Sequence, residues 1–168
     1  GGSLGARSIN EFILAGYDRL LRSGYQVIWQ TGGFYFEEMK QRIPSSSDSI
    51  IIKDFVREMH YAYAVADVVI SRAGALSIAE LMLTGKPSVL VPSPNVAEDH
   101  QTINAQALVE RDAAVMVKDS EGREKLLDIA IELLEDDAHK EALSKNIKEM
   151  SHPDAAKDIA NEIVKLVS

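Results

Sequence analysis

Short, almost entirely apolar segments alternate along this chain with segments in which apolar residues recur at helical spacing. Strands that are continuous apolar runs are buried on both faces of a sheet, and helical connections between them make that sheet parallel. The alternation therefore predicts an α/β fold, with a Rossmann-like parallel sheet and helices on both faces. The predicted strands span residues 25–30, 49–53, 67–70, 88–91 and 113–117, and the predicted helices span 8–21, 36–43, 59–66, 75–84 and 102–110.

The last part of the chain, residues 121–168, is predicted to be helical throughout. Two apolar stripes at helical spacing run through it. The first consists of Leu126, Leu127, Ala130, Leu133 and Leu134, and the second of Ala156, Ile159, Ala160, Ile163, Val164 and Val167. We expect both stripes to pack in the core of one domain, residues 1–168, whose Rossmann-like part ends near residue 120.

Composition excludes several classes of function. The chain has 168 residues, 46% hydrophobic and 26% charged, which is ordinary for one globular domain. A net charge of -8 argues against nucleic-acid binding, which normally needs a basic face. The absence of cysteine excludes disulfides and thiolate metal sites. No apolar run approaches the ~20 residues that span a bilayer.

The chain begins with a glycine-rich turn, Gly1-Gly2-Ser3-Leu4-Gly5, without a methionine. Such a turn usually follows a strand, so we expect a truncated first strand and a chain cut from a longer protein. The turn matches the G-x-S-x-G pattern of serine hydrolases, although none of the four histidines is an evident partner for Ser3. The same turn could bind phosphate through its N–H groups and the Ser3 hydroxyl. Ser3 could also simply start a helix.

Residues 67–85 contain a buried strand, a turn of small residues and a helix. Backbone N–H groups at a helix start attract phosphate, and Gly74 would let a ligand approach them. Arg72 could donate two hydrogen bonds to phosphate oxygens, and Glu80 could accept from two adjacent hydroxyls of a ribose. The alternative is purely structural, because Ser77 and Glu80 also match a capping box.

The loop over residues 92–104 follows a predicted strand and leads into a helix. Open α/β sheets bind ligands at the carboxyl ends of their strands, and amide side chains suit sugar hydroxyls. Asp99 could cap the helix, as could Thr102. Asp99 and His100 could also bind a metal, but no third ligand is evident, so we expect no metal site. The candidate sugar-binding residues in this loop are His100, Gln101 and Asn104.

Three motifs in this order resemble the MurG family of N-acetylglucosaminyltransferases, which convert lipid I to lipid II in peptidoglycan synthesis. The motifs are residues 1–7, 71–80 and 98–105, and the similarity extends over essentially the whole chain, including 63–67 and 153–156. The resemblance implies one half of a GT-B fold, the C-terminal half that binds UDP-N-acetylglucosamine. It also implies that the N-terminal, acceptor-binding domain is absent from this sequence.

The resemblance also implies a set of substrate-binding residues. By this similarity Ser3 faces the diphosphate, Val56 lies against the uracil, and Glu80 holds the ribose hydroxyls. Arg72 is added on the basis of its charge. Backbone groups of Ala75, Leu76 and Ser77 would face the nucleotide, and the sugar would meet Gln101, Asn104 and His100.

The family's reaction is an inverting transfer in which the muramyl 4-hydroxyl of lipid I attacks C1 of the donor sugar as UDP departs. Helix N-termini can stabilise the leaving diphosphate, so no metal or other cofactor is expected. We expect the catalytic base in the absent domain, which would also associate with the cytoplasmic face of the bacterial inner membrane. The chain alone should then be inactive. The alternatives are a domain similar to UDP-N-acetylglucosamine epimerases and a stand-alone nucleotide-sugar-binding subunit completed by another chain.

Overall fold

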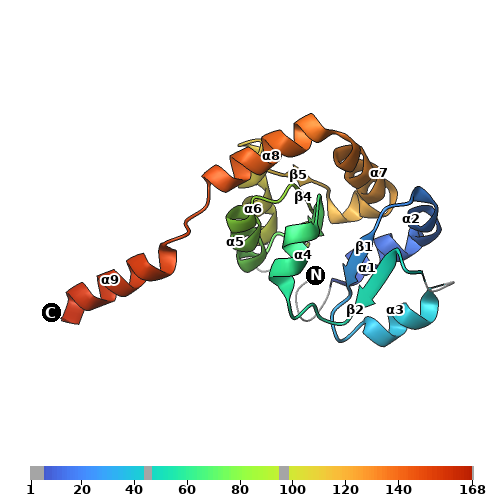
Figure 1. Ribbon diagram of the computed structural model, residues 1–168, viewed down its shortest axis with the longest axis horizontal. Helices are drawn as coiled ribbons and strands as arrows, with labels where there is room; N and C mark the ends of the chain where they lie inside the picture. The colour runs from blue at the N-terminus through green and yellow to red at the C-terminus, as the bar shows by residue number, and fades with distance from the viewer. Residues whose placement is uncertain (1–5, 44–46, 95–98, 168) are drawn as a thin grey trace.

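Parallel strands and the helices that connect them make up most of the structure, a computed structural model that describes residues 6–43, 47–94 and 99–167 (Figure 1). All five predicted strands are present, each within a few residues of its predicted bounds. Two of them, β1 (Val27–Gln30) and β2 (Ile50–Lys53), pair in parallel. The other three, β3 (Val69–Ser71), β4 (Ser88–Leu90) and β5 (Val115–Met116), pair in parallel in that order. The predicted α/β class with parallel strands is confirmed.

The strands of the described residues form two sheets, whereas the sequence predicted one. Strands β1 and β3 are each bonded to one neighbour in their own sheet, and no described segment pairs with both of them. The paired residues Ile28 and Ile51 are 46% and 47% exposed, so β1 and β2 are not covered on both faces. The predicted truncated first strand concerns residues 1–5, which lie outside the described residues.

Helices follow the strands in the predicted order. One difference lies near the start, where a single helix was predicted from residue 8 to residue 21. It is divided at Gly16. A Cβ at Gly16 would lie 1.9 Å from Leu127 Cδ1, so only glycine lets the helix that carries Leu127 come this close. The helices are α1 (Arg7–Ala15), α2 (Tyr17–Ser23), α3 (Phe36–Arg42), α4 (Met59–Val65), α5 (Ala75–Thr84), α6 (His100–Val109), the 3-10 helix η2 (Asp119–Glu121), α7 (Gly122–Glu135), α8 (Asp137–Glu149) and α9 (Ala155–Val167).

Apolar side chains from helices and strands form two clusters. One joins α1, β1 and α7, and includes the fully buried Leu126, as the first apolar stripe predicted. The other lies beneath α5, α6 and α8, and includes Leu81 and Ile147. Full burial of each such side chain stabilises the fold by roughly 1.5–3 kcal/mol. The second cluster packs beneath α5 and α6, the two helices that begin at the edge of the β3-β4-β5 sheet.

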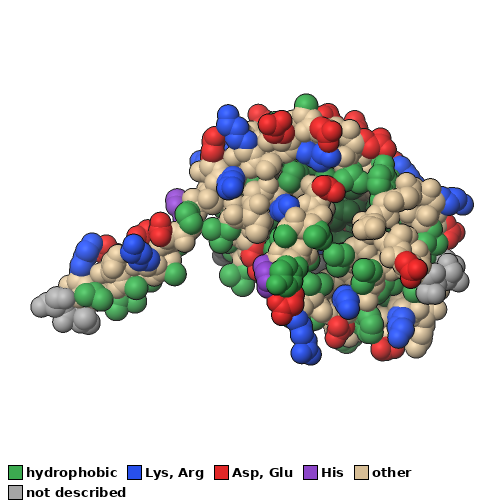
Figure 2. All heavy atoms as spheres, in the orientation of Figure 1, with side chains coloured by type: hydrophobic (Ala, Val, Ile, Leu, Met, Phe, Trp, Pro, Cys, Tyr) green, Lys and Arg blue, Asp and Glu red, His purple; other side chains and the backbone are tan. Residues whose placement is uncertain are grey.

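The second apolar stripe does not pack in a core as predicted. Helix α9 extends away from the rest of the described chain, with hydrophobic side chains along one side (Figures 1 and 2). In this stripe Ile159 is 62% exposed and Ile163 is 56% exposed, and Leu166 of the same helix is 85% exposed. The prediction was wrong because periodicity identifies the apolar face of a helix without identifying the surface that covers it. None of the described helices has the length and apolar character needed to cross a membrane.

Candidate functional site

Two helices begin at the carboxyl edge of the β3-β4-β5 sheet. Helix α5 follows β3 after three residues, and α6 begins after the loop that follows β4. Their starts lie close together, because Asn104 Nδ2 in α6 donates a hydrogen bond of 3.2 Å to the carbonyl of Ala73, just before α5. Helix N-termini present N–H groups without intrahelical partners, and the helix dipole makes this end positive. This edge of the sheet can therefore hold an anion.

The start of α5 is open to a ligand. Gly74 is the N-cap, with φ -70° and ψ 147°, and a Cβ built on it would have no neighbour within 4 Å. Ala75, Leu76 and Ser77 form the first turn of the helix that the sequence predicted at 75–84, and the Leu76 side chain is 83% exposed. The N–H groups of this turn are thus accessible beside a residue with no side chain.

The capping-box interpretation of Ser77 and Glu80 is wrong. Helix α5 begins at Ala75 with Gly74 as its N-cap, so Ser77 lies inside the first turn and cannot be the cap. The Glu80 carboxylate instead accepts a hydrogen bond from Tyr63 Oη on α4, at 2.9 Å. Burial, together with this hydrogen bond, raises the pKa of Tyr63, so the phenol stays a donor. Glu80 is exposed, and its other oxygen can accept from a ligand.

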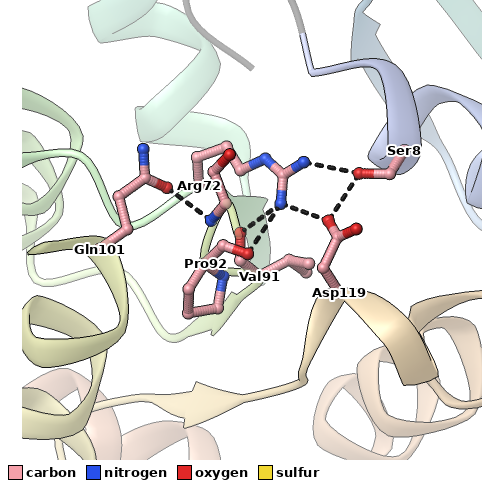
Figure 3. Close-up of polar contacts among 7 residues, drawn as sticks. Ser8, Arg72, Val91, Pro92, Gln101 and Asp119 are labelled. Atoms are coloured by element: carbon pink, nitrogen blue, oxygen red, sulfur yellow. Dashed lines mark hydrogen bonds and ion pairs between the residues drawn. The ribbon is translucent and has the colours of Figure 1, made fainter. Parts of the chain in front are cut away.

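Arg72 lies at the centre of a polar network that joins four parts of the fold (Figure 3). Its Nη1 donates to the carbonyls of Val91 and Pro92, both at 3.0 Å, and to the Asp119 carboxylate at 2.5 Å. Its Nη2 donates to Ser8 Oγ at 2.6 Å, and Ser8 Oγ donates to Asp119 at 2.6 Å. The structure therefore gives Arg72 acceptors within the protein, and its contact with phosphate stays a prediction.

The two predicted sugar-binding amides also anchor α6. Gln101 Oε1 accepts a hydrogen bond of 2.9 Å from the N–H of Ser93, after β4 (Figure 3). This orients the Gln101 side chain so that Nε2 is left as the donor for a ligand. Asn104 Nδ2 donates to Ala73, which leaves Oδ1 as the acceptor. The first two turns of α6 thus offer one donor and one acceptor.

The other candidate residues of this loop, His100 and Asp99, lie at the start of α6. His100 is the first residue of α6 and is exposed. Asp99 is the N-cap, with φ 53°, and its side chain accepts from Thr102 Oγ1 at 2.6 Å rather than from a backbone N–H of the helix. Over the described residues, no group of three or more His, Cys, Asp and Glu is placed to hold a metal ion.

Val56 lies in the loop that follows β2, beside the sheet of β1 and β2. Its N–H donates to Gln30 Oε1 at 2.8 Å, and Gln30 ends β1, so the loop after β2 is held at the carboxyl edge of that sheet. Ser3, the predicted diphosphate ligand, lies outside the described residues.

Sequence reasoning assigned no role to Tyr63 or Asp119. Asp119 could have been found, because it is a polar residue two positions after the end of the predicted strand 113–117. Tyr63 gave no such signal, because its partner is 17 residues away on another helix.

The family model described as glycosyltransferase family 28 C-terminal domain matches residues 1–159. The chain belongs to glycosyltransferase family 28. Membership in this family argues against the serine-hydrolase interpretation of residues 1–5.

Curated relatives of this family 28 chain are longer than the chain itself. A protein of Cytophaga hutchinsonii is 51% identical over the whole chain, which covers 45% of that protein. A protein of Flavobacterium psychrophilum is 49% identical over 99% of the chain, again 45% of its length. Both are named UDP-N-acetylglucosamine–N-acetylmuramyl-(pentapeptide) pyrophosphoryl-undecaprenol N-acetylglucosamine transferase. The chain thus spans about half the length of the curated relatives it matches.

Solved structures agree with the family assignment. The crystal structure of Acinetobacter baumannii MurG matches 98% of the family 28 chain with a TM-score of 0.83 and 28% identity, over 48% of that protein. The glycosyltransferase VinC matches 87% of the chain with a TM-score of 0.66 and 17% identity, over 35% of that protein, and so shares the fold. The chain therefore has the fold of the C-terminal half of a GT-B glycosyltransferase.

Proposed function

We propose that this chain is the donor-binding half of an inverting glycosyltransferase that transfers N-acetylglucosamine from UDP-N-acetylglucosamine to lipid I. The observation that carries the proposal is the pair of helix starts at one sheet edge, with the Glu80 carboxylate further along α5. The relatives' names support transfer rather than epimerisation, since they describe N-acetylglucosamine transferases.

The start of α5 suits the diphosphate of the donor. Its free N–H groups and the positive end of the helix dipole favour an anion, and Gly74 leaves room for the phosphate oxygens. Glu80 lies five residues beyond Ala75, about 7.5 Å along the helix axis. A single nucleotide can therefore place its phosphates at the first turn and its ribose hydroxyls at Glu80. The loop that holds Val56 would then lie against the uracil.

The N-terminal part of α6 suits the sugar. Gln101 Nε2 can donate and Asn104 Oδ1 can accept, because the other half of each amide is bound by the backbone at Ser93 and at Ala73. Sugar hydroxyl and acetamide groups offer both donors and acceptors. His100, the first residue of the same helix, would complete this part of the site.

The chemistry follows from these positions. The acceptor hydroxyl attacks C1 of the sugar, the bond from C1 to the diphosphate oxygen breaks, and UDP leaves with the negative charge. The helix N-termini stabilise that charge in the transition state, as fixed backbone dipoles do in other transferases and hydrolases. The base that takes the hydroxyl proton belongs to the N-terminal domain in this proposal, as do the binding of lipid I and association with the cytoplasmic face of the membrane.

The exposed stripe of α9 supports the presence of a second domain in the complete protein. In this proposal Ile159, Ile163 and Leu166 are covered by the N-terminal domain. That domain accounts for the part of the relatives' length that this chain does not span. Apolar side chains spaced along one helix face are typical of such an intramolecular interface.

Calorimetric titration tests the nucleotide site. We expect the chain to bind UDP and UDP-N-acetylglucosamine, to bind ADP more weakly, and to lose roughly tenfold in affinity for UDP on Glu80→Ala, equivalent to about 1.4 kcal/mol. Glu141→Ala, on the exposed face of α8, is the matched control and should leave binding unchanged. Equal binding of UDP and ADP, or indifference to Glu80→Ala, would contradict the proposal. Transfer to lipid I by the chain alone would show that the base lies within it.

A further inference from the structure

Tyr63 is anchored in the core by its ring and reaches the proposed nucleotide site with its hydroxyl. The ring packs against the cluster beneath α5 and α6, and the side chain is half-buried. By contrast Tyr61, on the same helix, is 66% exposed. The Tyr63 hydroxyl donates to Glu80 Oε2 at 2.9 Å. A rigid donor is thus directed at the one carboxylate that we place against the ribose.

The helix that carries Tyr63 is itself held in place. Lys86, two residues after the end of α5, donates from Nζ to the carbonyl of Ala66 at 2.8 Å and to that of Ala64 at 3.4 Å. These carbonyls lie at the C-terminal end of α4, where backbone acceptors lack helical partners. The end of α4 is therefore tied to the end of α5. The Lys86 contacts and the hydrogen bond from Tyr63 to Glu80 together hold these two helices at a fixed separation.

An exposed glutamate needs such help to bind a ligand well. A free Glu side chain has three rotatable bonds, and fixing it on binding opposes association through lost conformational entropy. A hydrogen bond to one carboxylate oxygen removes part of that freedom before the ligand arrives. The second oxygen is then presented to the ligand in a constant position.

We propose that Tyr63 is a positioning residue of the nucleotide site, which acts through Glu80 and increases its preference for a ligand with two adjacent ribose hydroxyls. The inference rests on the proposed function. It adds a role for α4, a helix that contacts neither the phosphates nor the sugar in that proposal.

The test uses Tyr63→Phe, which removes the hydroxyl and keeps the ring that packs in the core. We expect UDP to bind this variant about 3-fold to 10-fold more weakly than the unaltered chain. In a Glu80→Ala background the same substitution should have no further effect, because its partner is gone. With 2′,3′-dideoxy-UDP, which lacks both hydroxyls, the unaltered chain and Tyr63→Phe should bind equally. Tyr61→Phe is the control and should bind UDP normally.

The outcomes separate this inference from the proposed function. If Glu80→Ala weakens UDP binding and Tyr63→Phe does not, or strengthens it, the positioning role is overturned while the nucleotide site stands. If Tyr63→Phe weakens UDP and dideoxy-UDP binding by the same factor, Tyr63 acts on the fold and not through Glu80, and the inference is again overturned. If Glu80→Ala leaves UDP binding unchanged, both the proposed function and the inference fail.

Discussion

The Arg72 guanidinium and the Asp119 carboxylate form an ion pair across 47 residues of sequence, between the end of β3 and η2. Their side chains are only 15% and 19% exposed, so solvent screens the pair less than it screens a pair on the surface. The Ser8 hydroxyl bridges the same two side chains (Figure 3). The pair therefore connects α1 to the edge of the sheet at which we place the donor.

Replacement of Arg72 by alanine should lower the free energy of unfolding by about 2–4 kcal/mol. The change leaves the partly buried Asp119 carboxylate, and two backbone carbonyls, without their shared donor. Urea denaturation measures the effect. Arg19→Ala is the control, because the pair of Arg19 with Asp128 is 50% and 61% exposed and should contribute less than about 1 kcal/mol. Equal small losses in both variants would mean that the buried network contributes little.

Gly74→Ala should separate ligand binding from stability. A methyl group at Gly74 meets no atom within 4 Å, so the free energy of unfolding should fall by no more than about 1 kcal/mol. The same methyl group stands where we place the phosphates and should weaken UDP binding. Gly122→Ala offers the reverse comparison, because its Cβ would lie 2.3 Å from Phe12 Cε2 and should destabilise the fold by about 1–3 kcal/mol. Unchanged UDP affinity in Gly74→Ala would place the phosphates elsewhere.

Charged substitutions on α9 should leave this chain about as stable as before. Ile159→Glu and Ile163→Glu change exposed side chains, which usually alters stability by less than about 0.5 kcal/mol. Leu143→Ala, in the core beneath α8, should cost about 2–5 kcal/mol. In a protein that also contains the N-terminal domain, the two α9 variants should weaken domain association, measured by thermal unfolding. A loss in this chain as large as that of Leu143→Ala would show that α9 packs on the described domain in solution.

The pair of Glu11 and Arg42 should make stability depend on pH. Arg42 Nη2 donates to Glu11 Oε2 at 2.8 Å, and this hydrogen bond holds the pKa of Glu11 below its usual value. A carboxyl group with a lowered pKa in the folded state stabilises the fold above the pKa of the unfolded state. That stabilisation disappears as the pH falls through the folded pKa. Glu11→Gln should therefore lower the melting temperature at pH 7, and the difference should disappear as the pH falls below about 4.

A control distinguishes this ion pair from the net charge of the chain. Glu141→Gln removes one negative charge from the exposed face of α8. If its melting temperature changed with pH as that of Glu11→Gln does, the net charge of -8 would explain the result without Arg42.

Local patterns predicted the elements well, because a helix or a strand depends mainly on neighbours in sequence. Helix α5 has the predicted bounds, 75–84, and the strand before it begins two residues and ends one residue later than predicted. The division at Gly16 was missed because apolar spacing continues past it, and the contact that requires glycine there, with Leu127, is more than a hundred residues away. Contacts of this range leave no periodic signal in the sequence.

The amino-acid sequence by itself determined the α/β class, the order of strands and helices, and the placement of Glu80 and Gln101 on segments that begin at one sheet edge. Only the tertiary structure decided which atoms these side chains contact. It gave Arg72 protein acceptors, paired Glu80 with Tyr63, and left Ile159 of α9 exposed. The physical reason is that hydrogen bonds and burial depend on distances in space, whereas periodicity and turn residues constrain only the local path of the backbone.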